Sequence, residues 1–181
     1  AYSAATSGRP KGAILTHFNL INAAKNLTEQ EEMKKNDDYF SFLPLSWVNE
    51  KVVSTVVPLI IGFATNFPEK PHTVMVDLRE IGPQTLLAPP RVYQSLMSNF
   101  IIRMEGASWF KLKVYGLFKK YGDKKAVADA NNEVLSGMDK LMYFLGDAMI
   151  FSAIRDHLGL GRLRRAYVAG AALQQDAFHF Y

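Results

Sequence analysis

The chain has 181 residues, of which 49% are hydrophobic and 21% are charged, and its formal net charge is +4. These proportions are typical of one globular domain with a sizeable core. The charge does not indicate nucleic acid as a partner, because a dedicated binding protein would show a denser basic stripe or a known motif. The absence of cysteine excludes disulfides, thiol catalysis and thiolate metal sites.

Neither a secretory signal nor a membrane-spanning segment is evident in the sequence. The N-terminus lacks a charged start followed by an apolar block. The longest uncharged run, residues 52–68, is shorter than the ~20 residues of a spanning helix, and prolines and a glycine interrupt it. We therefore expect a cytoplasmic protein. Because the chain has no initiator methionine and enters a dense motif at once, we also interpret it as a piece of a longer protein.

Apolar periodicity and the placement of glycine and proline predict strands that alternate with helices. Strands are expected at 12–17, 37–45, 63–67, 85–90 and 162–170. Helices are expected at 18–35, 47–61, 72–83, 91–108, 109–125, 138–161 and from 174 onward, with 126–137 as a loop or a weakly helical excursion. The alternation indicates βαβ units, so the predicted fold class is α/β, with a mainly parallel sheet flanked by helices.

The opening stretch, YSAATSGRPKGAILTH, is rich in glycine and hydroxylated residues. A loop of this kind can turn its backbone N–H groups toward an anion, and Lys11 adds a compact charge suited to phosphate. It matches neither the Walker A loop nor the Rossmann fingerprint. On composition alone, a surface turn remains the alternative to a phosphate site.

The opening stretch resembles the signature loop of the AMP-forming adenylate enzymes, Tyr-Thr-Ser-Gly-Thr-Thr-Gly-x-Pro-Lys-Gly. The matching residues are Tyr2, Thr6, Gly8, Pro10, Lys11 and Gly12, and Ser3 and Ser7 are hydroxyl exchanges. Ala4 and Ala5 depart from the Ser and Gly of the pattern. Three further stretches, 41–52, 66–98 and 163–181, resemble the long-chain acyl-CoA synthetase branch in the same order.

This resemblance implies an enzyme that activates a long-chain fatty acid with ATP to an acyl-adenylate, and then transfers the acyl group to coenzyme A. The chain would be an incomplete part of the N-terminal, AMP-binding domain, with the C-terminal domain and the N-terminal part absent. It would use ATP, Mg²⁺ and coenzyme A. The catalytic lysine and the magnesium-binding glutamate of the family lie outside these 181 residues, so no catalytic residue is assigned and the isolated chain is expected to be inactive.

The resemblance also implies the site residues. Those expected to contact ATP phosphates are Ser3, Thr6, Ser7, Gly8 and Lys11. Those expected to line the acyl and adenylate pocket are Trp47, Gly170, Ala171 and Ala172. For Trp47 the alternative is a tryptophan packed in the core, and for the glycine segment it is a tight strand-to-helix connection. Glu50 is expected to be a surface carboxylate rather than a pocket group.

A lysine-rich helix is the last feature with a functional interpretation. Between residues 109 and 125, six lysines alternate with large apolar side chains. The region Lys111–Lys125 could contact anionic lipid, or it could be the solvated face of an amphipathic helix. The four histidines have no metal-ligand spacing, and no metal site is predicted.

Two other functions are compatible with the same residues. One is adenylation of a different carboxylic acid, such as an amino or aryl acid. The other is a non-catalytic relative of the fold, in which Ala4 and Ala5 have weakened the ATP loop. An alanine Cβ at a position that needs positive φ costs ~1 kcal/mol or more, which is the physical basis of the second alternative.

Overall fold

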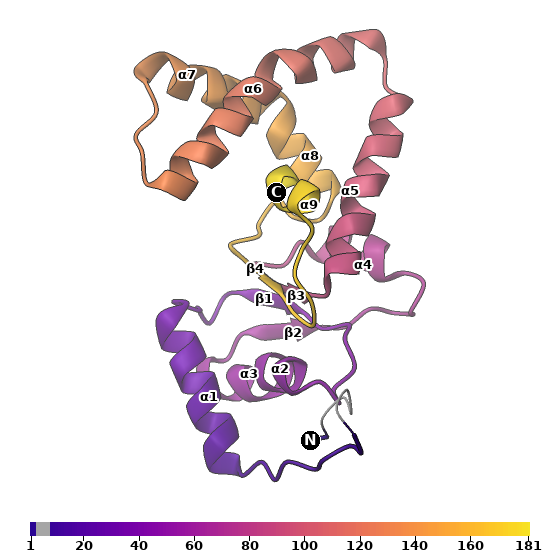
Figure 1. Cartoon of the computed structure of the whole chain (residues 1–181), viewed down its shortest axis with the longest axis vertical. Coiled ribbons are helices and arrows are strands. Elements are labelled where there is room, and N and C mark those ends of the chain that lie inside the picture. The colour runs from indigo at the N-terminus through magenta and orange to yellow at the C-terminus, as the bar shows by residue number, and fades with distance from the viewer. Residues whose placement is uncertain (3–7) are drawn as a thin grey trace.

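A computed structural model of the chain describes residues 1–2 and 8–181 and shows an α/β fold (Figure 1). Its sheet is entirely parallel and has the order β2-β1-β3-β4. The prediction of a parallel sheet flanked by helices is therefore confirmed. The strands are β1 (Asp38–Phe40), β2 (Ala64–Asn66), β3 (Thr85–Ala88) and β4 (Arg165–Val168).

The helices connect these strands in chain order, as the alternation of the sequence predicts. Before β2 they are α1 (His17–Gln30), α2 (Val48–Lys51), the π-helical turn η1 (Val52–Val56) and α3 (Val57–Ile61). Between β2 and β4 they are α4 (Val74–Ile81), α5 (Pro90–Glu105), α6 (Trp109–Asn131), α7 (Gly137–Gly146), the π-helical turn η2 (Asp147–Phe151) and α8 (Ser152–His157). The described chain ends with α9 (Gln175–Phe180).

Two hydrophobic clusters cover the two faces of the sheet. Tyr39 of β1 and Leu87 of β3 pack against α1, η1 and α3 on one face. Phe40 of β1 and Leu86 of β3 pack against α4, α5 and the segment after α8 on the other face. Successive residues of a strand point to opposite faces of the sheet. Because both faces are covered, Tyr39 and Phe40 of β1 and all four residues of β3 are buried.

The helical run 48–61 contains a π-helical turn because Pro58 lies inside it. Proline has no N–H to donate to the carbonyl of Ser54, four residues earlier. The hydroxyl of Thr65 in β2 donates to that carbonyl instead, at 3.1 Å. Val57 bonds Val52, five residues back, and the helix then ends at Gly62 with a φ of 78°. The hydrogen bond from Thr65 therefore connects this helix to β2, an edge strand of the sheet.

A buried ion pair lies at the amino end of the sheet. Asp37, which precedes β1, accepts a hydrogen bond from Nη1 of Arg165 at 2.8 Å, and both side chains are nearly inaccessible. The same guanidinium donates to the carbonyls of Glu31 and Glu32, so it also holds the end of α1. Burial alone would raise the pKa of Asp37, but the Lys34 N–H and the two arginines 164 and 165 hold that pKa below its ordinary value.

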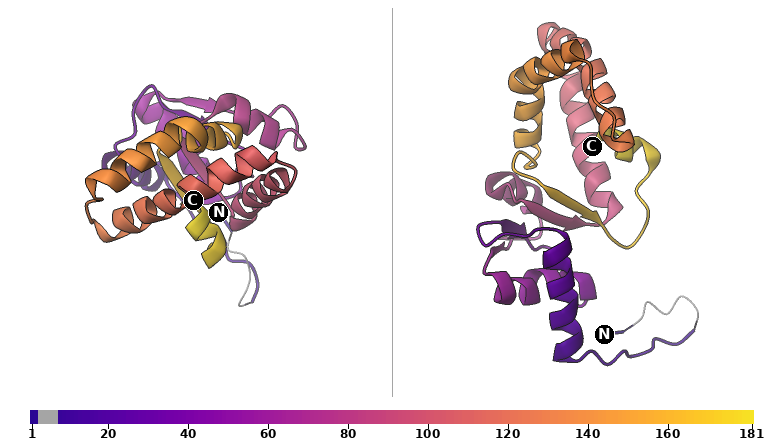
Figure 2. Two further views of the ribbon diagram at one scale, coloured as in Figure 1. Left: turned by 90° about the horizontal axis from the view of Figure 1, so that it is seen from above. Right: turned by 90° about the vertical axis from the view of Figure 1, so that its left-hand side faces the viewer.

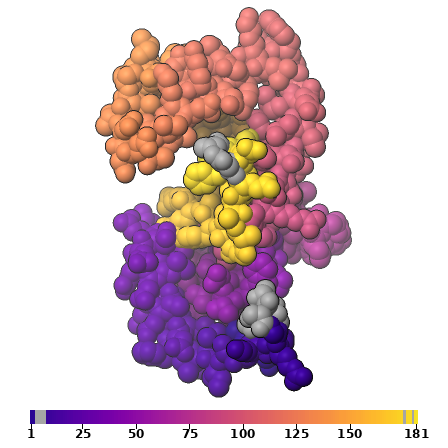
Figure 3. All heavy atoms as spheres, viewed as in Figure 1, coloured from indigo at the N-terminus to yellow at the C-terminus, as the bar shows by residue number. Residues whose placement is uncertain are grey.

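Helices α6 and α7 form a hairpin that projects away from the sheet (Figures 1 and 3). A Cβ on Gly146 of α7 would lie 2.9 Å from the side chain of Phe118 in α6. A Cβ on Gly122 of α6 would lie 3.2 Å from Phe151 in η2. Glycines at these two points of contact therefore let the helices of the hairpin pack closely.

Several sequence expectations are wrong in detail. Residues 13–16 form no strand, because that segment pairs only with Ala1 and Tyr2 and has no neighbouring strand within the described chain. Residues 126–131 continue α6. In α1, Phe18 and Ile21 are exposed although both are apolar, since Ala24 and its neighbours one turn away form the buried stripe.

The lysine-rich helix α6 is not amphipathic along its length. Its exposed side chains include large apolar ones, among them Trp109 at 72% and Phe110 at 64%. Phe118 and Ala128 are its buried residues. The buried helix 47–61 likewise has an exposed end, where Leu59 faces solvent. Large apolar side chains in both helices are therefore exposed in the described chain, although apolar periodicity favours their burial.

The ion pair at the amino end of the sheet predicts unequal effects of two neighbouring substitutions. Asp37→Asn should lower the free energy of unfolding at pH 7 by about 3 kcal/mol, because it leaves the buried Arg165 without its counter-charge. Asp38→Asn is the control and should cost less than about 1 kcal/mol, because its partner Arg162 is half exposed. Urea unfolding of the three proteins measures both values.

The difference between wild type and Asp37→Asn should also depend on pH. A carboxyl group whose pKa is lowered by folding stabilises the protein above its unfolded value of 3.8, and loses that contribution as pH falls through the lowered pKa. The gap should therefore narrow on acidification below pH 3.8. Equal losses for the two variants, or a gap that is independent of pH, would contradict this account.

Candidate functional site

The carboxyl ends of the parallel strands meet at one edge of the sheet. The segments that leave this edge are 41–47 after β1, 67–73 after β2 and 169–174 after β4. The chain proceeds from β1 to β2 on one side of β1 and places β3 on its other side. In open parallel sheets, ligands bind outside the carboxyl ends of the strands, at the point where the strand order reverses. That point lies between β1 and β3.

Trp47 and Gly170 lie near each other at this edge, although 123 positions separate them in sequence. A Cβ built on Gly170 would lie 3.8 Å from the indole ring. Gly170 has a φ of 94°, a conformation that favours glycine, and it directs the chain from β4 toward α9. Trp47 remains 39% exposed, so it is not a fully buried core residue.

Ala171 and Ala172 follow Gly170 and are also exposed. The next residue, Leu173, packs against the cluster that contains Phe40 and Leu86. The two alanines are therefore held between the Trp47 contact and an anchored leucine. The structure brings together the segments that contain all four residues expected in the acyl and adenylate pocket.

The expectation that Glu50 is a surface carboxylate is wrong, because its side chain is fully buried. The Tyr39 hydroxyl donates to Oε2 of Glu50 at 2.5 Å, and the Ser41 hydroxyl donates to Oε1 at 2.5 Å. Tyr39 and Ser41 are two residues apart, so strand alternation places both on the face of β1 that meets α2. This period-two spacing was the signal in the sequence that could have located the partners of Glu50.

Burial controls the ionisation of this cluster. It raises the pKa of Glu50, and the hydrogen bonds from Ser41 and Tyr39 oppose the rise only in part. Burial and the neighbouring carboxyl group also raise the pKa of Tyr39 far above its ordinary value, so the phenol stays protonated. Glu50 thus has two hydroxyl partners and, within the part of the chain that the structure describes, no cationic one.

The opening loop is closed at its base. Ala13 donates to the carbonyl of Ala1 at 2.7 Å, and the terminal amino group donates to the carbonyl of Ala13 at 2.9 Å. Tyr2 bridges Gly12 in antiparallel fashion, and a Cβ on Gly12 would lie 3.3 Å from the tyrosine ring. The loop therefore returns to its starting point before α1 begins, where Thr16 and Asn19 form a capping box.

Two of the expected phosphate contacts, Gly8 and Lys11, are described and are exposed to solvent. Gly8 has a φ of 137°, which an L-amino acid rarely adopts. Ser3, Thr6 and Ser7 lie outside the described residues, as do Ala4 and Ala5. The right-hand view of Figure 2 shows the opening segment and the segment after β4 on the same side of the molecule.

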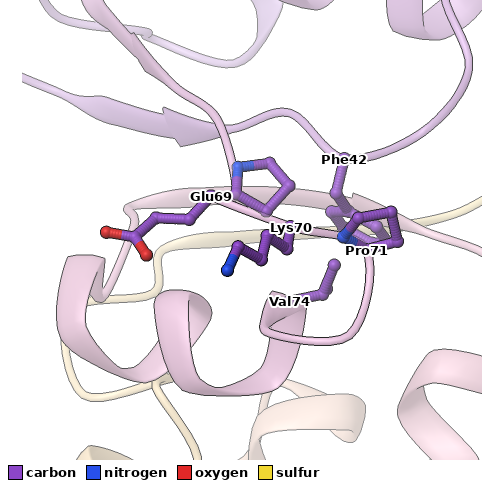
Figure 4. Close-up of a pocket in the computed structure, with 6 residues that line it drawn as sticks. Phe42, Glu69, Lys70, Pro71 and Val74 are labelled. Carbon is purple, nitrogen blue, oxygen red and sulfur yellow. The ribbon is translucent and has the colours of Figure 1, made fainter.

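A shallow cavity of about 440 Å³ lies beyond the carboxyl ends of β1 and β2 (Figure 4). Its walls combine apolar side chains with one acidic and one basic residue, namely Phe42, Pro68, Glu69, Lys70, Pro71 and Val74. Sequence reasoning did not single out these residues as a cavity. Trp47 and Gly170 are not among those lining it.

A metal site needs several histidine or carboxylate side chains close together. Within 1–2 and 8–181, no group of three or more histidine, aspartate or glutamate side chains could hold a metal ion. Asp37, a buried carboxylate, is instead paired with Arg164 and Arg165. These residues do not fit a Mg²⁺ site, and we assign none of them to that ion.

The sequence matches the AMP-binding enzyme family over residues 1–181. It is 25% identical to a long-chain-fatty-acid–CoA ligase, ACSBG2, of Rattus norvegicus, over 99% of this chain and 28% of that protein. It is 26% identical to the peroxisomal long chain acyl-CoA synthetase 6 of Arabidopsis thaliana, over 99% and 24%. It is 24% identical to a putative fatty-acid–CoA ligase, fadD11, of Mycobacterium tuberculosis, over 99% and 32%. The chain thus spans between about a quarter and a third of the length of these relatives.

The backbone of Gly170 predicts a local cost of adding a side chain. Gly170→Ala should lower the free energy of unfolding by about 1 kcal/mol, because φ is positive there, while the new Cβ meets the Trp47 ring at an ordinary distance. Gly137→Ala is the control, since φ is ordinary and nothing lies within 4 Å of the new Cβ. Urea unfolding should show Gly137→Ala at or above wild-type stability. A loss in the control as large as that at Gly170 would show that the cost does not come from positive φ.

Proposed function

This chain belongs to the AMP-binding enzyme family, and we propose that it acts in the ATP-dependent activation of a long-chain fatty acid. The fatty acid would be converted to an acyl-adenylate and then to its coenzyme A thioester. The observation that carries the proposal is the match of the whole chain to this family, together with relatives named as fatty-acid–CoA ligases. The proximity of Trp47 and Gly170 at the carboxyl edge of the sheet supports it, because the segments assigned to one pocket lie together there.

The proposed chemistry places specific demands on the site. A fatty-acid carboxylate oxygen forms a bond to the α-phosphorus of ATP while the bond to pyrophosphate breaks, so negative charge gathers on the leaving group. Positioning and charge stabilisation supply most of the catalysis of such a step. The coenzyme A thiol then attacks the acyl carbon, and AMP leaves with the electron pair of the broken C–O bond.

The residues of this chain have two proposed roles. Backbone and hydroxyl groups of Ser3, Thr6, Ser7 and Gly8, with the ammonium group of Lys11, would bind the ATP phosphates. Lysine suits this role because its charge is compact. Trp47 would lie against the acyl-adenylate, and the small residues Gly170, Ala171 and Ala172 would let that ligand approach the backbone.

We further propose that the chain is part of one AMP-binding domain of a longer enzyme, which would contribute the remaining catalytic groups. ATP, Mg²⁺, coenzyme A and a fatty acid would be its small-molecule partners, and its location would be cytoplasmic. Because these relatives are only 24% to 26% identical to the chain, two other functions are tested beside the proposed one. They are adenylation of another carboxylic acid and a non-catalytic relative with a weakened ATP loop.

Peripheral contact with a membrane is proposed for the region Lys111–Lys125. No helix in the described part of the chain is both long and apolar enough to cross a bilayer. Trp109 and Phe110 are exposed at the start of α6, next to Lys111 and Lys113, a combination that suits the interface of an anionic bilayer. Further along, Lys119, Lys124 and Lys125 pair with aspartates, whereas Lys111 and Lys113 in the first turns, and Lys120, form no ion pair among the described residues.

The activity is tested by ATP–pyrophosphate exchange with the full-length enzyme that contains this chain. Exchange should require a long-chain fatty acid. Lys11→Gln should lower kcat/KM about tenfold or more, because it removes the charge next to the leaving pyrophosphate. Arg9→Gln, which removes a cation two residues away, is the matched control and should change kcat/KM by less than about threefold.

The outcomes of this assay separate the three functions. Exchange that depends on amino or aryl acids alone would replace the proposed substrate. No exchange with any acid would favour the non-catalytic relative. Equal losses in the Lys11 and Arg9 variants would reject the specific role of Lys11.

Vesicle sedimentation tests the membrane contact. More of the protein should pellet with vesicles of phosphatidylcholine and phosphatidylserine than with phosphatidylcholine alone, because the lysines attract anionic headgroups. The double substitution Trp109→Ser and Phe110→Ser should reduce the pelleted fraction, whereas Leu59→Ser, at an exposed position on α3, should not. Equal recovery with the two vesicle types would reject the proposal.

A further inference from the structure

Glu50 occupies an unusual place for a buried carboxyl group. It is the third residue of α2, whose N-cap is Trp47, and the cap has no side-chain hydrogen bond. A glutamate at this position commonly folds back to the N-cap backbone. Here the side chain turns inward instead, and both of its oxygens bind hydroxyl groups of the segment at the end of β1.

These two hydrogen bonds join the ends of one loop. Tyr39 and Ser41 lie at and just beyond the carboxyl end of β1, and Glu50 lies one turn into the helix that follows. The loop between them contains Pro44, whose carbonyl accepts a hydrogen bond from the Trp47 N–H at 2.9 Å. The position of Trp47 is therefore defined on one side by this turn and on the other by the Glu50 anchor.

We propose that Glu50 is a positioning residue for the acyl-adenylate site, which holds the Trp47 indole against Gly170 through its bonds to Tyr39 and Ser41. This role depends on the proposed function only because that function identifies the ligand as an acyl-adenylate. The anchoring of Trp47 is a property of the chain itself. Glu50 does not reach the ligand, because it is fully buried beneath the loop.

The charged and titratable surroundings of Glu50 give this anchor a defined pH dependence. The titratable neighbour of Glu50 on β1 is Tyr39, and Tyr93 of α5 contributes to the raised pKa of Tyr39. Burial raises the pKa of both phenols, so both stay protonated near neutral pH. On α2 itself, Lys51 is exposed. The described residues thus include no cation that would stabilise an ionised Glu50.

The direction of the effect follows from linkage. Folding raises the pKa of Glu50 above its ordinary value of 4.5, so the folded protein binds the proton more tightly than the unfolded chain does. The contribution of the cluster to stability is therefore complete below pH 4.5 and declines as pH rises through the raised pKa. Glutamine imitates the protonated acid, since its amide can donate to one hydroxyl oxygen and accept from the other.

Tryptophan fluorescence of the 181-residue chain tests the anchor without catalysis. The chain has two tryptophans, and Trp109→Phe leaves Trp47 as the single reporter. In that background, Glu50→Ala should shift the Trp47 emission to longer wavelength, and Glu50→Gln should keep the wild-type maximum. Ser54→Ala is the control: it alters another buried polar group of the same helical run, whose hydroxyl contacts only Thr55 among the described residues.

Urea unfolding of the Glu50→Gln chain keeps the proposal falsifiable if Glu50→Ala does not fold. The stability of Glu50→Gln relative to wild type should increase as pH rises above 4.5, because only the wild type must ionise a buried group. A difference that is constant with pH would overturn the proposal. So would a Trp47 emission that is unchanged in Glu50→Ala.

Kinetics of the full-length enzyme then test the consequence for the site. Glu50→Ala should raise KM for the fatty acid about tenfold while KM for ATP changes by less than about threefold, and Glu50→Gln should restore most of the loss. Equal effects on both KM values would indicate a merely structural role and would overturn the proposal. If the enzyme shows no exchange at all, the proposed function fails, while the fluorescence and unfolding results still decide whether Glu50 anchors Trp47.

Discussion

The pairing of β1 with strands on both sides is the constraint on which the rest of the structure depends. β2 and β3 both run parallel to it, so the helices that connect them must lie on the faces of the sheet. Tyr39 and Phe40 consequently point to opposite hydrophobic clusters. The segment that leaves the carboxyl end of β1 emerges beside the end of β3, and its Trp47 lies near Gly170, which follows β4 on the other side of β3.

The two ends of β1 carry buried carboxyl groups in opposite electrostatic situations. At the amino end, Asp37 is balanced by arginine, which overcomes the cost of burial and lowers its pKa. At the carboxyl end, Glu50 has only hydroxyl partners among the described residues, and burial raises its pKa. An ion pair fixes the sheet at the end away from the candidate site. At the end where a ligand would bind, two hydroxyl groups that donate to the buried Glu50 fix the loop.

The sequence predicted the features that depend on local pattern, and it failed where a feature depends on neighbours. Alternating strands and helices, the glycine that ends α3 and the α/β class all follow from short-range periodicity and turn chemistry. The segment 12–17 has the composition of a strand, but among the described residues it forms only an isolated bridge, with Tyr2, and belongs to no sheet. Glu50 has the character of a surface residue, and only the position of α2 over β1 buries it. The pocket residues were identified by resemblance, because Trp47 and Gly170 show no local signal that they meet.

We propose that the opening loop and the neighbouring residues Trp47 and Gly170 belong to one site for an acyl-adenylate. A crystal structure of the enzyme with a non-hydrolysable acyl-adenylate analogue tests it most directly. We predict the phosphate mimic at the loop that contains Gly8 and Lys11, with the rest of the analogue against Trp47 and the Gly170–Ala172 segment. Binding of the analogue elsewhere, with Trp47 and Gly170 near each other but without ligand, would contradict this proposal.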